Sequence, residues 1–437
     1  MISPQRRQEI IDALRRGTVP QRSLDAFAVG LEPFEAVLDE ELATVAGGAG
    51  HFKALRGDYG SGKTFFARWL QEKAKTQGFA TAEVQISETE TPLHKLETVY
   101  RRLIERLSTA DTHQGALRSI LDAWFYALEE DVLAEGGVDE SDANALLART
   151  DALMEQRLAA INRHAPAFAS GLRAYRRAVA EGEHAIADGI LAWLSGEPNV
   201  GMASKRYAGL KGSVDHFGAL SFLQGLLVIL RDSGFPGLLL VLDEVETLQR
   251  VRSDVREKSL NALRQLLDEV DSGRFPGLYI LITGTPAFFD GPQGIRRLPP
   301  LAQRLETDFQ TDARFDNPRA TQIRLTAFDQ ARLEEVGRHI RNLYAQDAKT
   351  QERILRLADD AYLADLVRAV SGRLGGRVGI APRVFLKKLV GDVLDRIDLH
   401  ADFDPRENYA LLIQDSELTE VERNAAASNP DDVELEL

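Results

Sequence analysis

Short apolar runs alternate with amphipathic stretches along most of the 437-residue chain. Helical spacing fills most of the intervals between these runs. The runs that have the length and composition of strands are 52–56, 81–86, 238–242, 278–283 and 322–325. Strands that alternate with helices are typical of a mostly parallel sheet with helices on both faces. The pattern therefore predicts an α/β fold, with a three-layer α/β/α core around a parallel five-stranded sheet.

Two stretches have helical spacing and few strand signals. Residues 108–215 are rich in Ala, Leu, Glu and Arg, and we interpret them as a helical insertion with a loop at 197–212. Residues 329–400 have the spacing of three helices and predict a C-terminal lid. The expected domains are an N-terminal helical segment (1–50), a core that contains the insertion (51–328), the lid (329–400) and an acidic tail (401–437).

Composition narrows the class of protein. The formal net charge is −14, there is no cysteine, and a charged content of 27% is typical of a soluble globular protein. A chain without cysteine has no disulfides, thiolate metal sites or cysteine nucleophiles. The longest apolar runs are far too short to span a bilayer, and residues 1–16 lack the apolar core of a signal peptide. We expect a cytoplasmic protein with no membrane partner, and not one that coats DNA through overall positive charge.

The strongest single motif is the run Gly57-Asp58-Tyr59-Gly60-Ser61-Gly62-Lys63-Thr64, which fits G-x-x-x-x-G-K-[ST] without a mismatch. A predicted strand precedes it and a predicted helix follows it, which is the context that this motif needs. Such a loop turns successive N–H groups toward one point, at the positive end of the helix dipole. The run therefore predicts the polyphosphate site of a P-loop NTPase. Lys63 would reach the β- and γ-phosphates, and the Thr64 hydroxyl would hold Mg²⁺.

The apolar run 238–242 ends in two acids, Asp243 and Glu244. Five apolar residues predict a buried central strand, and ligands bind at the carboxyl ends of strands in open α/β sheets. In a nucleotide site Asp243 would hold Mg²⁺, through water, and Glu244 would polarise the attacking water. The alternative is an ordinary strand that ends in a solvated turn.

Two further residues are candidates for contact with phosphate. Thr283 ends the run that begins at Leu278, and Thr285 is the alternative because strand ends are hard to locate from sequence. Arg383 opens the last long helix, so that it would contact phosphates if the lid folds over the nucleotide. The alternatives are strand-end turn chemistry for the threonines and a local acidic partner for the arginine.

Arg304 follows the predicted helix after that strand and could reach the γ-phosphate of a neighbouring subunit. It could equally be a surface arginine, since the chain has many. The residues that compete with it for this role are Arg296, Arg297 and Arg314.

In the order of these motifs the chain resembles the AAA+ ATPases, over roughly residues 27–399. The matching pieces are GDYGSGKT, LLLVLDE, Thr283, Arg304 and the Ala-Pro-Arg of 381–383. Residues 27–31 resemble the adenine-side motif of the origin-recognition and replication-initiator clade. This resemblance implies that Val19 and Val29 lie on the adenine side of the nucleotide. The run GLLLVLDEVETL at 237–248, together with 28–32, is similar to the ATP-binding proteins of bacterial BREX phage-defence systems, the BrxD type.

The resemblance implies an oligomeric ATPase that uses ATP and Mg²⁺ in phage defence. It would act as a DNA-associated switch, or recruit or load a partner helicase or another BREX component. Alternatively, it is a nucleotide-gated signalling or scaffold protein with slow hydrolysis and no direct DNA contact. A small-molecule kinase would not need the lid or Arg383.

Two features depart from the initiator pattern. The helical insertion separates Lys63 from Asp243, and the residues after the lid are too few and too acidic for a winged-helix domain. DNA contact would then come from the ring interior or from the insertion, where 173–177 and 205–206 are basic. The alternative is that these charges form a solvated surface.

Overall fold

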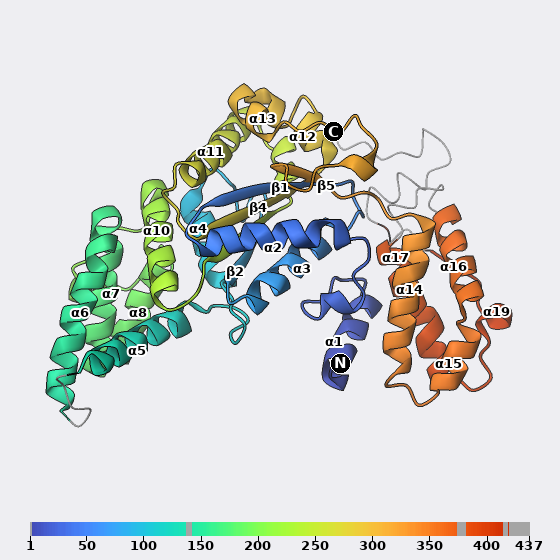
Figure 1. Ribbon diagram of the computed structural model, residues 1–437, viewed down its shortest axis with the longest axis horizontal. Coiled ribbons are helices and arrows are strands. Elements are labelled where there is room, and N and C mark those ends of the chain that lie inside the picture. Colours follow the sequence, from blue (N-terminus) through green and yellow to red (C-terminus); the bar gives the residue numbers. More distant parts are fainter. Residues whose placement is uncertain (1, 137–141, 374–381, 414–417, 419–437) are drawn as a thin grey trace. The chain divides into compact units, whose positions relative to one another are not determined.

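The protein is described from a computed structural model that covers residues 2–136, 142–373, 382–413 and 418 (Figure 1). The chain forms two compact units, each assembled from separate segments. Unit 1 consists of 1–37, 55–72 and 307–437, and unit 2 of 38–54 and 73–306.

Within the described residues, five strands form one parallel sheet in the order β2-β3-β4-β1-β5. They are β1 (His51–Arg56), β2 (Ala80–Gln85), β3 (Leu238–Asp243), β4 (Leu278–Gly284) and β5 (Gln322–Arg324). The predicted α/β fold with a five-stranded parallel sheet is confirmed. Every strand begins and ends within one residue of its predicted run, and β3 is fully buried, as the unbroken apolar run predicts.

Both faces of the sheet are covered in unit 2. Leu240 and Ile280 belong to a continuous apolar core on one face. The helices on that face are α4 (Leu96–Arg106), α10 (His216–Asp232) and α11 (Ser253–Asp271). Val241 and Leu281 point the other way and are also fully buried. Helix α2 (Glu32–Ala46) covers this second face, where its Glu41 accepts a hydrogen bond from Tyr279.

A buried charged cluster fixes α2 to the second face. The Lys53 ammonium donates to one oxygen of Glu41, the Tyr279 hydroxyl donates to the other at 2.6 Å, and His51 Nε2 lies 3.3 Å from the latter. Burial lowers the pKa of Lys53, because the ammonium loses its water. Burial would raise the pKa of Glu41, but the neighbouring His51 imidazole and the charge of Lys53 outweigh it and lower that pKa.

The stretch between β2 and β3 is helical, as predicted. After α4 it contains α5 (Leu117–Glu135), α6 (Ala143–His164), α7 (Pro166–Ala180), α8 (His184–Leu194) and α9 (Met202–Ala208). The prediction of a loop at 197–212 is wrong in part, because its middle forms α9. Gly209 ends this short helix in the left-handed conformation, with φ 65°, so the glycines bound the helix instead of preventing it.

Unit 1 is helical after β5. Its helices are α14 (Gln330–Ala345), α15 (Gln351–Leu357), α16 (Asp360–Arg373), α17 (Pro382–Lys387), α18 (Asp395–Leu399) and α19 (Pro405–Asn408). A π-helical segment, Lys388–Leu394, joins α17 to α18. The prediction of three helices is too low for the described residues, because a helix as short as α15 has little periodic signal. Helix α1 (Pro4–Arg15) joins this group through an ion pair from Arg15 Nε to Asp395 at 2.6 Å.

Glu41→Ala should lower the free energy of unfolding by about 3 kcal/mol, because Lys53 becomes a buried charge without its carboxylate. Urea unfolding followed by circular dichroism measures this. Glu41→Leu combined with Lys53→Met removes both charges and should recover most of the loss. Glu35→Ala, at an exposed position of α2, is the control. An equal effect of Glu35→Ala and Glu41→Ala would show that the cluster does not fix the helix.

Candidate functional site

The glycine loop lies between β1 and α3 (Lys63–Thr76). Gly60 and Gly62 have φ angles of 78° and 93°, which L side chains rarely adopt. Gly57 has no room for a side chain, since a Cβ would lie 2.3 Å from Ser61 Oγ. The backbone thus requires glycine at Gly60 and Gly62, and at Gly57 a side chain would displace the Ser61 hydroxyl. Left-handed residues next to right-handed ones are the backbone pattern from which N–H nests for phosphate are built.

Lys63 is the first residue of α3 and is buried. Its Nζ donates to the carbonyl oxygens of Gly57 at 2.9 Å and Asp58 at 3.4 Å, and lies 5.1 Å from the centre of the Tyr59 ring. The ammonium is therefore directed into the loop, at the positive end of a helix. Thr64, half-buried, follows on the first turn. The residues present fit the triphosphate of ATP.

The N-terminal segment of unit 1 packs along α3. Arg68 donates to the carbonyl oxygen of Val19 at 2.8 Å, and Trp69 Nε1 donates to Asp25 at 2.6 Å. Val19 is half-buried and Val29 is buried. The two valines expected on the adenine side thus belong to a segment held against the helix that follows the glycine loop.

The acid pair is in unit 2, where one hydroxyl contacts both residues. Thr283 Oγ1 donates to Asp243 and accepts the backbone N–H of Glu244 at 3.1 Å. Asp243 is buried, and Thr283 is fully buried. Thr285, the alternative residue at the end of the strand, directly precedes α12 (Pro286–Asp290). Its side chain does not accept a capping hydrogen bond from the backbone of that helix. The end of β4 therefore holds the end of β3 through Thr283.

Glu244 has a left-handed backbone, with φ 59° and ψ 42°. Among the described residues other than glycine, Ser23 alone shares a positive φ. This conformation costs an L-residue about 1–2 kcal/mol, and such strain is concentrated at functional sites. Glu244 is thus held in a strained turn directly after a buried strand.

Gln85 is a site residue that sequence reasoning missed. It is the last residue of β2, is paired in register with Asp243, and donates from Nε2 to Glu244 Oε2 at 2.8 Å. A polar residue at the end of a strand next to β3 is the signal that could have found it. The Glu244 carboxylate is therefore restrained by a neighbouring strand.

Arg304 lies on α13 (Pro299–Leu305) of unit 2. Its guanidinium forms ion pairs with Asp268 and, at 3.2 Å, with Asp271, while 41% of the side chain is exposed. Among the competing arginines, Arg297 donates to the carbonyl oxygen of Pro292, and Arg314, in unit 1, pairs with Asp312. Arg304 is thus paired on the surface of its own unit.

Arg383 is the second residue of α17 in unit 1 and is half-buried. Its guanidinium lies beside Gly17, where a Cβ would be 3.8 Å from Nη1. Ala381, the first residue of the Ala-Pro-Arg motif, lies outside the described residues. Arg383 therefore contacts the turn that follows α1.

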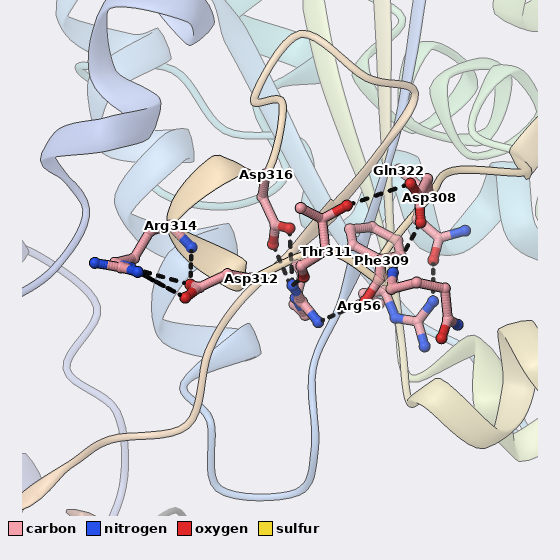
Figure 2. A network of polar contacts seen from close by, with 10 residues as sticks. Arg56, Asp308, Phe309, Thr311, Asp312, Arg314, Asp316 and Gln322 are labelled. Carbon is pink, nitrogen blue, oxygen red and sulfur yellow. Dashed lines mark hydrogen bonds and ion pairs between the residues drawn. The ribbon is translucent and has the colours of Figure 1, made fainter.

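The base of the glycine loop is part of a polar network (Figure 2). Arg56, the residue before Gly57, donates to Gln322 Oε1 at 3.0 Å. The guanidinium carbons of Arg56 and Arg324 lie 4.6 and 5.1 Å from the centre of the Phe309 ring. Arg324 also donates to Asp316 at 2.8 Å. The segment before β5 is thereby fixed to the ends of β1 and β5.

The described residues lack two features that would narrow the function further. They include no group of three or more His, Asp or Glu side chains arranged to hold a metal ion. Magnesium would therefore depend on phosphate oxygens and water as well as protein ligands. In the same part of the chain, no helix has the length and apolar character needed to cross a membrane.

A parallel α/β sheet with this glycine loop after β1 and an acid pair after β3 defines a P-loop nucleotide-binding core. The model of the family "BREX system ATP-binding protein BrxC/D" matches residues 2–412. The chain belongs to this family, so it is an ATP-binding protein of a phage-defence system, and the predicted similarity is confirmed. Membership of the origin-recognition clade remains a prediction. No curated protein matches the chain.

Glu244→Gly should raise the free energy of unfolding by about 1 kcal/mol, because glycine adopts the left-handed conformation without strain. Thermal and urea unfolding measure the change. Ser23→Gly, at φ 59°, is a control with the same backbone and no acid. It should stabilise the protein similarly. A loss of stability in Glu244→Gly alone would show that contacts of the carboxylate outweigh the strain.

Proposed function

We propose that this protein hydrolyses ATP with Mg²⁺ and works in the cytoplasm as an oligomeric, DNA-associated switch. It would recruit or load a partner helicase or another component of the defence system. The observation that carries the hydrolysis proposal is the pair Asp243 and Glu244, held by Thr283, with Glu244 in a strained conformation. A protein that only binds ATP has no need of an acid in such a position.

Each residue of the proposed site has a role that its chemistry supports. The N–H groups of 57–62 and the Lys63 ammonium bind the phosphates. Thr64 and Asp243 hold Mg²⁺, with Asp243 acting through water. Val19 and Val29 line the adenine side. Bound Mg·ATP supplies the γ-phosphate that water attacks.

Glu244 is the proposed general base. Its carboxylate accepts the proton of the attacking water at Oε1, while the hydrogen bond from Gln85 holds Oε2. The Thr283 hydroxyl positions both acids at the end of β3. Gln85 thus restrains the residue on which turnover depends.

Two arginines complete the proposed site. Arg304 would reach a γ-phosphate from a neighbouring subunit, and Arg383 would contact phosphate from the lid. The ion pairs of Arg304 are exposed, and exposed pairs contribute only about 0–1 kcal/mol, so exchange for a phosphate costs little. This supports a site that depends on oligomerisation.

A nucleotide-gated scaffold with slow hydrolysis is the second candidate. It is favoured by the bond from Gln85 to Glu244 and by the net charge of −14, which opposes DNA binding by the chain as a whole. ATP turnover that is slow and unchanged by DNA and by protein concentration would support it.

Lys63→Ala should abolish ATP binding, because the loop loses its only side-chain cation, whereas Glu244→Gln should keep binding and lower turnover by at least about 10²-fold. Equilibrium binding of a fluorescent ATP analogue and phosphate release measure the two effects. Glu257→Gln, at an exposed position of α11, is the control. Undiminished turnover in Glu244→Gln would remove the proposed base.

Mixing Arg304→Ala with Lys63→Ala subunits should restore part of the turnover that each variant lacks alone, because mixed interfaces combine an intact loop with an intact arginine. Phosphate release is measured over a range of subunit ratios. The same experiment with Arg296→Ala tests a competing arginine. Failure of rescue at every ratio would count against Arg304 acting in trans.

A further inference from the structure

The insertion carries two basic runs whose surroundings differ. In α7, Arg173 pairs with Glu155 at 2.6 Å, and Arg176 pairs with Asp151 at 2.9 Å. Arg177 donates to the backbone oxygen of Tyr207 at 2.9 Å. This first run therefore holds the helices of the insertion together.

The second run, on α9 and the turn after it, is different. Lys205, Arg206 and Lys211 have no side-chain hydrogen bond or ion pair to any residue within the described part of the chain. Elsewhere in the insertion, arginines such as Arg118 and Arg157 pair with acids. Three neighbouring cations that lack acidic partners are therefore open to an external anion.

The geometry of α9 directs its charges outward. Ser204 is buried against α8, where a Cβ on Gly189 would lie 2.1 Å from its Oγ. With 3.6 residues per turn, Met202 and Arg206 lie on the side opposite Ser204, and Lys205 lies at the flank. Met202 is 69% exposed. The solvent face of α9 is thus a basic helix face with one apolar side chain.

The turn after α9 also stands in solvent. Gly209 and Gly212 have φ angles of 65° and 66°, and a Cβ on either would meet no atom within 4 Å. Lys211 lies between them and is exposed. Apart from their chain neighbours, no described residue crowds the Cα atoms of these two glycines.

An exposed aromatic ring stands on α10, the helix that follows this turn in the chain. Trp193 Nε1 donates to the Gly212 oxygen at 3.4 Å, and the Trp193 ring packs against Phe222 of α10 with centroids 5.2 Å apart. Phe217 precedes Phe222 by five positions, which is about 7.5 Å along the helix and about 140° around it, so its side chain leaves α10 on a different side from the buried Phe222 ring. Phe217 is 73% exposed. Trp193 thus joins the turn that carries Lys211 to the helix that carries Phe217.

We propose that a basic surface, formed by Met202, Lys205, Arg206, Lys211 and Phe217, binds a single nucleic-acid strand. The three cations contact phosphates, and the Phe217 ring stacks on a base. The proposal deepens the proposed association with DNA and rests on it.

The chemistry favours a nucleic-acid strand over other polyanions. Unpaired cations together with an exposed aromatic ring on the next helix are the combination that single-strand binding proteins use, since every base has a flat face to stack on. Phosphate contacts require no pocket, so a protruding helix and turn suffice. An acidic protein segment would satisfy the charges, but a single exposed ring gives it no groove to occupy.

The test measures how tightly the full chain binds a labelled oligothymidine strand in the absence of ATP. Fluorescence anisotropy reports the binding over a range of salt concentrations. In Lys205→Ala/Arg206→Ala/Lys211→Ala, the slope of log K against log salt should become smaller in magnitude by about 2, since each contact contributes about 0.7 for single strands. Phe217→Ala should weaken binding about tenfold with an unchanged slope, and Phe217→Tyr should bind like wild type.

A matched control replaces three exposed cations outside the surface, Arg163, Lys349 and Arg356, by alanine. It should leave the slope unchanged, and an equal loss of slope in this control would overturn the proposal. So would a wild-type chain that does not bind the strand at low salt, or one that binds only a peptide copying the acidic residues 419–437. A stronger preference for duplex over single strand would overturn the role of Phe217.

The test separates this proposal from that of ATP hydrolysis. Lys63→Ala should bind the strand like wild type, because Lys63 is not part of the basic surface. If the protein binds the strand but does not hydrolyse ATP, the basic surface is supported and the proposed hydrolysis is rejected. If the protein hydrolyses ATP but does not bind the strand, the hydrolysis is supported and the basic surface is rejected as a DNA-binding site.

Discussion

Burial of β3 and β4 on both faces is the constraint on which the rest of the structure depends. The backbone N–H and C=O groups of these strands form hydrogen bonds with neighbouring strands. Their side chains are buried and mostly apolar, and a buried polar side chain needs a hydrogen-bond partner of its own. Thr283 has its partners in the two acids, and Tyr279 has one in Glu41. Polar chemistry is therefore confined to the strand ends and to a few hydrogen-bonded positions.

The parts of the fold that depend on local sequence could be predicted well. The apolar run of β3 ends in two acids, and a buried strand that stops at charged residues can be located within a residue. The spacing of glycines in the loop predicts positive φ angles, and Gly60 and Gly62 have them. The roles proposed for Arg304 and Arg383 would depend on bound phosphate and on neighbouring subunits, which local patterns do not describe.

What depends on pairing between distant segments could not be predicted. The basic run 173–177 and the pair 205–206 look alike as sequence. Acids on another helix form ion pairs with arginines of the first, whereas no described residue pairs with the side chains of the second. Gln85 is an unremarkable strand residue until the register pairs it with Asp243. Helix α9 was missed because its flanking glycines resemble those of a loop, although they only end the helix.

The network around Phe309 has a mechanical consequence. Two guanidinium groups share one aromatic ring, and each also has a hydrogen-bonded oxygen partner, so the assembly has few soft degrees of freedom. Arg56 is covalently joined to the first residue of the glycine loop. A displacement of that loop would act directly on the contacts that Arg56 makes with Gln322 and with the Phe309 ring. Within unit 1, the glycine loop is thus coupled through Arg56 to the segment around 308–316.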